Sequence, residues 1–411
     1  MMSSARHPSR VPARLRPARS FTLVALLLAG CAAVPDEQVG AQAPALFDDA
    51  QFGPAQPPLE AATVFGLSPE MKRFLDADLL PTAHALGSRK VLTEALYTHG
   101  RLRLEYESSM TRNAGEAFAA RSGNCLSLVI MTGAFATAMG LEVSYQSVTS
   151  DEMWSRAGDM YFMSGHVNLS IAPPLGERLT QWSRAGAYTI DFMPPDDAAR
   201  THVHAISEAT VLAMYLNNLA AEAMVQGRLA EAYWHARQAV VVAPAFLSAY
   251  NTLGVIYLRH GDARHAEAVL RHVLDRTPDN AVVLTNQLLA LRALGRDAEA
   301  ARAAEHLARI EPVAPFHYFE LGRAALNAGD PVAARGFFSK EIERAPDYHE
   351  FHFWLAVADA ELGRLVEARA ELMVAMDDAG RHSDRELYAA KLDKLKDWQA
   401  AAGRLPALPP H

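Results

Sequence analysis

Two hydrophobic patterns divide the chain near residue 207. Between residues 60 and 207, helical patterns are mixed with strict alternation of apolar and polar positions, which is typical of half-buried strands. The alternating segments are residues 142–148, 166–171 and 187–192. Ser68 followed by Pro69 has the form of a helix start, with Ser as N-cap, and predicts a helix to about Leu80. Residues 60–207 are therefore predicted to form an α+β domain.

From about residue 208 the pattern is helical throughout and repeats every 34 residues. Small or helix-ending residues recur at the same place in each unit. They are Gly227, Gly261, Gly295, Gly329 and Gly363; Ala232, Ala266, Ala300, Ala334 and Ala368; and Pro244, Pro278, Pro312 and Pro346. Each unit thus predicts a helix, a turn at Gly, a second helix with Ala at a close helix contact, and a terminating Pro. A fixed period of this kind indicates a repeat array.

These units resemble the tetratricopeptide repeat. Gly254 and Gly322 stand where that family prefers a small residue in the first helix, whereas Leu288 departs from that preference. The resemblance implies five helical hairpins over residues 208–382, stacked into an all-α solenoid that holds a protein or peptide partner. Residues 383–411 open with a capping-box pattern and are expected to form a C-terminal capping helix and tail.

The first thirty residues have the pattern of a signal peptide. Five Arg precede the apolar run from Phe21 to Leu28, which is shorter than the roughly 20 residues that span a bilayer. The run ends in Leu28-Ala29-Gly30-Cys31, which resembles the lipobox of bacterial lipoproteins. That resemblance implies removal of residues 1–30 and lipid attachment at Cys31. An ordinary secretory signal with an incidental Cys is the alternative.

Two further expectations follow for the mature N-terminus. Ala32, rather than Asp, follows the Cys, so the lipobox resemblance favours an anchor in the outer membrane, facing the periplasm. Residues 31–59 carry five Pro among Ala, Gln and Asp without apolar periodicity, and they predict a flexible tether.

Charge and composition exclude several classes of partner. Removal of residues 1–30, which hold five Arg and no acid, changes the formal net charge from −8 to −13. An acidic protein of this kind is not expected to bind nucleic acid. His202 and His204 alternate, but no Cys, Asp or Glu at metal-ligand spacing joins them, and no phosphate-binding Gly loop is present. Neither a metal nor another cofactor is therefore expected.

Cysteine usage draws attention to Cys125. The chain has two cysteines, so acylation of Cys31 leaves Cys125 without an intramolecular disulfide partner. The sequence Arg121-Ser122-Gly123-Asn124-Cys125 precedes an apolar helical stretch, which places the thiol in the first turn of a helix. The helix dipole and free N–H groups there stabilise a thiolate, which is the nucleophilic form. A buried structural Cys is the alternative interpretation.

Two other residues supply what a nucleophilic thiol needs. His166 begins one predicted strand and could take the thiol proton, while Asp191 ends the next and could orient the imidazole. This order resembles the transglutaminase-like superfamily, whose papain-like Cys-His-Asp site has Cys at a helix N-terminus and His and Asp on neighbouring strands. The bacterial branch that couples such a domain to tetratricopeptide repeats is the most similar. Many members have an aromatic residue where this chain has Asn168.

The resemblance implies a thiol acyl-transfer enzyme. Hydrolysis of the thioester by water gives a peptidase or amidase, and attack by an amine gives a transglutaminase-like crosslinker. The backbone N–H of Cys125 is the expected oxyanion donor, with Asn124 and Tyr161 as candidates for a second. The competing hypothesis is a noncatalytic, lipid-anchored scaffold. Convergence of Cys125, His166 and Asp191 within hydrogen-bond reach distinguishes the two.

Overall fold

The computed structural model describes residues 43–97, 102–108, 110–149, 154–157, 160–163, 166–172, 187–192 and 202–402. The predicted signal peptide, the predicted lipidation site at Cys31 and the tail from residue 403 lie outside the described residues. Within these ranges, none of the helices combines the length and the apolar character needed to cross a membrane.

Helices dominate the first part of the described chain. They are η1 (Ala43–Leu46), η2 (Asp49–Phe52), α2 (Ala61–Phe65), α3 (Pro69–Phe74), η3 (Leu75–Leu79), α4 (Leu80–Leu86), α5 (Ser88–Tyr97), α6 (Ala114–Ala120) and α7 (Cys125–Ala138). The predicted start at Ser68 is confirmed, because its Oγ accepts a hydrogen bond from the Met71 N–H at 3.2 Å. The helix continues through the π-helical turn η3 into α4, six residues beyond the predicted end.

An antiparallel sheet of four strands follows, in the order β7-β6-β3-β8. Its strands are β3 (Glu142–Thr149), β6 (His166–Ala172), β7 (Tyr188–Ile190) and β8 (His202–Ile206). The three alternating segments predicted as strands are thus confirmed. Strand β6 lies between β7 and β3, and every one of its side chains is buried. Two short pairs complete the described strands: β1 (Glu105–Tyr106) runs parallel to β2 (Ser122–Gly123), and β4 (Trp154–Ala157) antiparallel to β5 (Met160–Met163).

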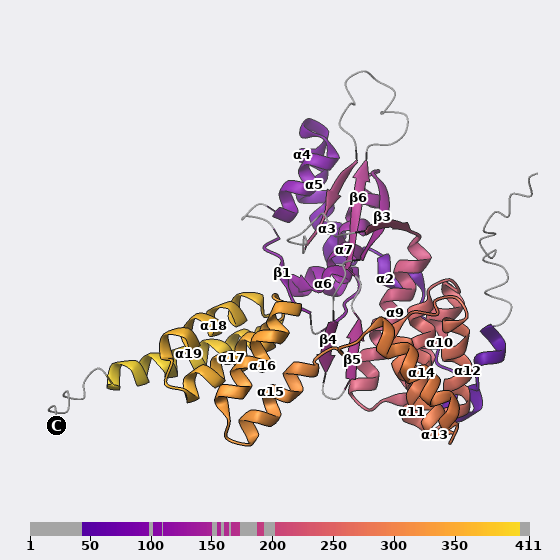
Figure 1. Ribbon diagram of the computed structural model, residues 1–411. Helices are drawn as coiled ribbons and strands as arrows, with labels where there is room; N and C mark the ends of the chain where they lie inside the picture. The colour runs from indigo at the N-terminus through magenta and orange to yellow at the C-terminus, as the bar shows by residue number, and fades with distance from the viewer. Residues whose placement is uncertain are drawn as a thin grey trace, which may run out of the picture. The chain divides into compact units, whose positions relative to one another are not determined.

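Helix α7 is the core helix of this α+β region and packs on β6 and β3 (Figure 1). Its residues from Leu126 to Ala136 are all buried, and a helix that is apolar on every side belongs in a core. The Tyr145 hydroxyl of β3 occupies the space that a side chain at Gly133 would fill. The sheet and α7 are therefore held face to face at van der Waals contact.

The helical half consists of five hairpins and a final helix. The hairpins are α9 (Glu208–Val225) with α10 (Leu229–Val242), α11 (Leu247–His260) with α12 (Ala263–Leu274), α13 (Ala281–Ala293) with α14 (Asp297–Ile310), α15 (His317–Asn327) with α16 (Pro331–Arg344), and α17 (His349–Glu361) with α18 (Leu365–Asp378); α19 (His382–Ala402) follows. The five phased Gly have φ between 68° and 91°, a left-handed conformation that favours Gly, and the five phased Ala are all buried. The predicted tetratricopeptide-like helical half is confirmed.

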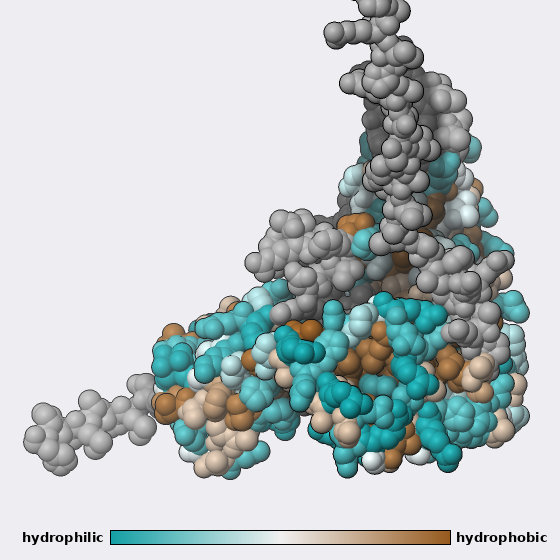
Figure 2. All heavy atoms as spheres, turned by 45° about the vertical axis from the view of Figure 1, so that its right-hand side comes forward, coloured by the Kyte–Doolittle hydropathy of each residue, from teal (hydrophilic) through white to brown (hydrophobic). Residues whose placement is uncertain are grey.

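The hydrophobic core is not continuous along the hairpins. One buried cluster joins the α+β region to the first three hairpins and ends at Ala290, whereas the fourth hairpin has a separate cluster around Phe319 and Phe338. Helix α14 is rich in Ala and buries only Ala300 among its fourteen residues. Short side chains give α14 little apolar volume to pack against a following helix. The surface of the helical half in Figure 2 is mostly hydrophilic, with hydrophobic side chains in separate groups.

Residues 43–59, which the sequence predicts to be part of a flexible tether, are instead bound to the first two hairpins. Phe52 is 3% exposed and stacks on Tyr233 of α10 with the ring centroids 3.9 Å apart. The Gln238 side chain donates to the main-chain oxygen of Leu59 at 2.8 Å and accepts from its N–H at 3.0 Å. The tether prediction is wrong here because these residues are held by the repeat helices, not by apolar periodicity of their own.

Close packing in the fourth hairpin gives a stability test. A Cβ at Gly322 would lie 2.5 Å from the ring of Phe338, which is fully buried and cannot move aside. We therefore expect Gly322→Ala to destabilise the fold by about 1–3 kcal/mol through overpacking. Urea unfolding followed by circular dichroism measures the change.

Gly336 is the matched control. It lies in the same hairpin, on helix α16, and its added Cβ would meet nothing within 4 Å. Gly336→Ala should stabilise the protein by about 0.4–1 kcal/mol, because Ala restricts the unfolded chain and favours helix. Equal and stabilising effects of both substitutions would contradict the close packing at Gly322.

Candidate functional site

Cys125 is the first residue of α7, and the polar residues around it fix the start of that helix. The Asn124 Oδ1 accepts hydrogen bonds from the N–H of Ser127 at 2.9 Å and from its Oγ at 2.8 Å. The Asn124 Nδ2 donates to the Thr111 Oγ1 at 3.0 Å. A Cβ at Gly123 would lie 2.7 Å from the Ser127 Cβ, so only Gly fits at the entry. The half-buried thiol of Cys125 is thus presented at a capped helix N-terminus.

His166 and Asp191 meet across the neighbouring strands β6 and β7. The register pairs Leu169 with Ile190, which places Asp191 one residue past the end of β7. The His166 Nε2 lies 2.6 Å from the Asp191 Oδ1, and the Asn168 Nδ2 donates to the Asp191 Oδ2 at 3.1 Å. Asn168 therefore holds the carboxylate that faces the imidazole.

The buried imidazole also lies beside the Cys125 thiol. The His166 side chain is 3% exposed, and its Nδ1 is buried without a hydrogen bond of regular geometry to any described residue. Burial lowers the His166 pKa, but the hydrogen bond to Asp191 and the nearby Cys125 thiol outweigh it and raise the pKa to about 9. The structure brings together the three residues that the sequence singled out, with Asp191 on one side of the ring and Cys125 close to it.

This arrangement has the parts of an activated thiol. An imidazolium beside a thiol favours the thiolate, and a carboxylate on the far ring nitrogen fixes the orientation of the ring. The helix dipole at the N-terminus of α7 acts in the same direction. The first N–H groups of an α-helix have no partner within the helix, so the Cys125 N–H is available to a ligand.

The two candidates for a second oxyanion donor fare differently. The Asn124 side chain is held in the helix cap by Ser127 and Thr111, and one hydrogen of its Nδ2 is used by Thr111, so its role as an oxyanion donor stays a prediction. The Tyr161 side chain lies outside the described part of the structure. Tyr106, which sequence reasoning missed, lies nearby, because β1 runs beside the two residues that lead to Cys125. A pairing of two-residue strands leaves no periodic signal in the sequence.

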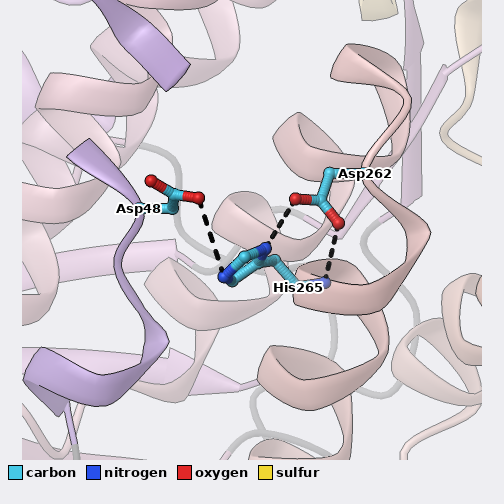
Figure 3. Close-up of side chains that lie close together, drawn as sticks. All are labelled: Asp48, Asp262 and His265. Carbon is cyan, nitrogen blue, oxygen red and sulfur yellow. Dashed lines mark hydrogen bonds and ion pairs between the residues drawn. The ribbon is translucent and has the colours of Figure 1, made fainter. Parts of the chain in front are cut away.

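A second polar cluster joins residues 43–59 to the second hairpin. Figure 3 shows Asp48 and Asp262 on either side of His265, whose Nδ1 lies 2.5 Å from the Asp262 Oδ2. Asp262 also caps α12, and Gln51 donates to both carboxylates. Burial opposes ionisation of Asp262, but the hydrogen bonds from Gln51 and His265 outweigh it and lower the pKa to about 2. We interpret the cluster as structural, because its hydrogen bonds join residues 43–59 to the second hairpin.

Comparison with known proteins gives a limited context. No family model matches the chain. The protein FlbA of Caulobacter vibrioides is 28% identical over 132 residues, which make up 32% of this chain and 22% of FlbA. The chain therefore matches about a fifth of the length of that relative.

Several solved structures are similar to this chain. They include TTC0263 of Thermus thermophilus (21% identical, TM-score 0.28, covering 44% of this chain and 98% of that one) and PilF of Pseudomonas aeruginosa (19% identical, TM-score 0.28, covering 48% and 90%). YrrB, a tetratricopeptide protein with an unusual peptide-binding site, is 19% identical with a TM-score of 0.24 and covers 44% and 92%. At these TM-scores the repeats are assigned from their period and hairpins alone.

The His166–Asp191 pair predicts a pH-dependent stability. A His pKa raised from its ordinary value near 6.5 to about 9 contributes stability that is complete below pH 6.5 and is lost as the pH rises through about 9. We expect Asp191→Asn to destabilise the protein by about 1.5–3 kcal/mol at pH 6, the range for a hydrogen bond to a charged group. The loss should shrink as the pH approaches 9.5. Urea unfolding at a series of pH values measures it.

Ser170→Ala is the matched uncharged control. It removes the 2.9 Å hydrogen bond between the hydroxyls of Ser170 and Thr189, which joins the same two strands. Its effect on the free energy of unfolding should be constant from pH 6 to 9.5, because neither hydroxyl titrates in that range. If the destabilisation by Asp191→Asn also stayed constant from pH 6 to 9.5, a stabilising pair between charged His166 and Asp191 would be excluded.

Proposed function

We propose that Cys125, His166 and Asp191 form the thiol acyl-transfer site of a transglutaminase-like enzyme. One observation carries the proposal: a buried imidazole is hydrogen-bonded to a carboxylate at 2.6 Å and lies beside a half-buried thiol at a helix N-terminus. Neighbouring groups of this kind convert an ordinary thiol into a nucleophile. The order of the three residues and their strands supports the same family.

The proposed reaction has two halves. The Cys125 thiolate attacks the carbonyl carbon of a carboxamide, a C–S bond forms, and the carbonyl oxygen becomes an oxyanion held by the Cys125 N–H. The oxyanion collapses, the C–N bond breaks, and the His166 imidazolium gives its proton to the departing amine. Neutral His166 then takes a proton from water, which attacks the thioester and releases a carboxylic acid and the thiol. An amine in place of water yields a new amide, so the same residues serve an amidase or a crosslinker.

The repeats would hold the partner or substrate. The first helices of the first three hairpins carry partly exposed Asn side chains, and Asn286 donates to Asn251 at 2.9 Å between neighbouring hairpins. Side-chain amides both donate and accept, which suits recognition of a peptide main chain. We therefore propose a protein or peptide partner on this surface.

The proposed location follows from the N-terminal sequence. The signal peptide and the lipobox ending at Cys31 support a lipoprotein of the bacterial envelope, anchored in the outer membrane and facing the periplasm. In that compartment the acyl donor would be an envelope protein or peptide. The lipid would keep the site near the membrane surface.

Alkylation of Cys125 by iodoacetamide tests the activated thiol. We expect the full-length protein to react at pH 6 at least about tenfold faster than an ordinary thiol, whose pKa is about 8.5 and which is almost wholly protonated there. His166→Ala should lose most of this advantage, because the imidazolium is gone. Mass spectrometry of the Cys125 peptide gives the rate without interference from Cys31.

His204→Ala serves as the control, since His204 is exposed on strand β8, which β3 separates from β6, and should leave the rate unchanged. An ordinary rate for the unmodified protein, or a rate indifferent to His166, would overturn the enzyme proposal. That outcome would favour the alternative, a noncatalytic scaffold in which both the α+β domain and the repeats bind proteins.

A further inference from the structure

The proposed acyl transfer leaves one half of its oxyanion site unassigned. The tetrahedral intermediate carries a full negative charge, and such charges are stabilised by preorganised donors, commonly two. The Cys125 N–H supplies one donor at the start of α7. The neighbouring Asn124 side chain is held in the helix cap, where its Oδ1 accepts from Ser127 and its Nδ2 donates one hydrogen to Thr111. A hydroxyl on a neighbouring element is another candidate for the second donor.

Strand β1 brings Tyr106 to the entry of α7. Tyr106 pairs with Gly123 in the parallel ladder, two residues before Cys125. The ladder is held on both sides, because the Glu105 N–H donates to the Arg121 oxygen at 2.9 Å and the Glu107 N–H donates to the Gly123 oxygen at 3.0 Å. Tyr106 is therefore fixed beside the segment that positions the thiol.

The C-terminal end of the repeats fixes Tyr106 from the other side. The guanidinium of Arg385 donates to the Tyr106 main-chain oxygen at 3.1 Å, and the Ser108 N–H donates to the Gly380 oxygen at 2.9 Å. A Cβ at Gly380 would lie 3.4 Å from the Tyr106 ring, which shows that the ring packs against this glycine. A side chain held by two elements is preorganised, which a catalytic donor requires.

The Tyr106 hydroxyl is a neutral donor on the strand that runs beside the entry of α7. Burial raises the Tyr106 pKa, and the negative charge of a Cys125 thiolate raises it further, so the hydroxyl keeps its proton at neutral pH. Within the described residues nothing forms a hydrogen bond with this hydroxyl. It is therefore protonated, and no described residue competes for its hydrogen bond.

We propose that the Tyr106 hydroxyl donates the second hydrogen bond to the oxyanion formed on Cys125. The hydroxyl only donates a hydrogen bond and keeps its proton, so the step needs no additional acid or base. The inference rests on the proposed acyl-transfer function and assigns Tyr106 a catalytic role within it. Because Arg385 and Gly380 contact Tyr106, the C-terminal end of the repeats would help to hold this donor in place.

Two probes separate oxyanion stabilisation from thiol activation. Acetyl transfer from p-nitrophenyl acetate to Cys125 passes through a tetrahedral oxyanion, whereas alkylation by iodoacetamide is a displacement at a saturated carbon and forms none. For Tyr106→Phe in the full-length protein, we expect acetylation to slow by about 10²–10³-fold, as for other oxyanion donors. Alkylation should stay within about twofold. Release of p-nitrophenolate and the mass of the Cys125 peptide report the two rates.

Tyr188→Phe is the control, because Tyr188 lies on β7 with 48% of its surface exposed and should change neither rate. Equal slowing of both probes in Tyr106→Phe would mean a structural role and would overturn the inference. Unchanged acetylation would also overturn it, while slow reaction of His166→Ala with both probes would leave the acyl-transfer proposal standing. A Cys125 that reacts with neither probe faster than an ordinary thiol would refute both.

Discussion

The candidate site depends on one interaction, the cap that Asn124 places on α7. Its Oδ1 accepts two hydrogen bonds from Ser127, and its Nδ2 holds Thr111. The Ser127 Oγ in turn accepts from the Arg112 N–H at 2.8 Å, so the loop before α6 is tied to the same point. Because α7 is buried along its length, its first residue cannot shift without disturbing the core. The cap and the buried helix together therefore fix the position of Cys125.

The sheet completes the geometry from the opposite side. Strand β6 packs on α7 and begins at His166, so the helix that presents the thiol and the strand that presents the imidazole share one buried contact. Strand β7 is the neighbour of β6, and its end delivers Asp191 to the far ring nitrogen. Each side chain of the site is therefore positioned by an element whose own place is set by the hydrophobic core.

Periodic features of the sequence were sufficient to predict the repeat hairpins and the strands that carry His166 and Asp191. The 34-residue spacing of Gly and Ala predicts the hairpins, and alternation predicts β3, β6 and β7, because both report which positions are buried. The meeting of His166 and Asp191 then follows from antiparallel pairing of strands that are neighbours in their sheet. Features held by side chains from distant residues were not predictable. A two-residue parallel ladder places Tyr106 beside Gly123 at the entry of α7, and residues 43–59 are bound by Tyr233 and Gln238 of the repeats.

A His–carboxylate pair alone does not mark a reactive site in this chain. His265 lies 2.5 Å from Asp262, and His352 lies 2.7 Å from Glu371, yet both pairs serve the repeats. The other ring nitrogen of His352 is 2.6 Å from the Pro346 oxygen, and that of His265 is 4.0 Å from Asp48, so each of these rings faces oxygen on both sides. His166 differs because its second nitrogen is buried without a regular hydrogen bond and a thiol lies beside the ring. The two rings in the repeats have no thiol beside them, whereas a ring that carries a charge beside a thiol can exchange a proton with it.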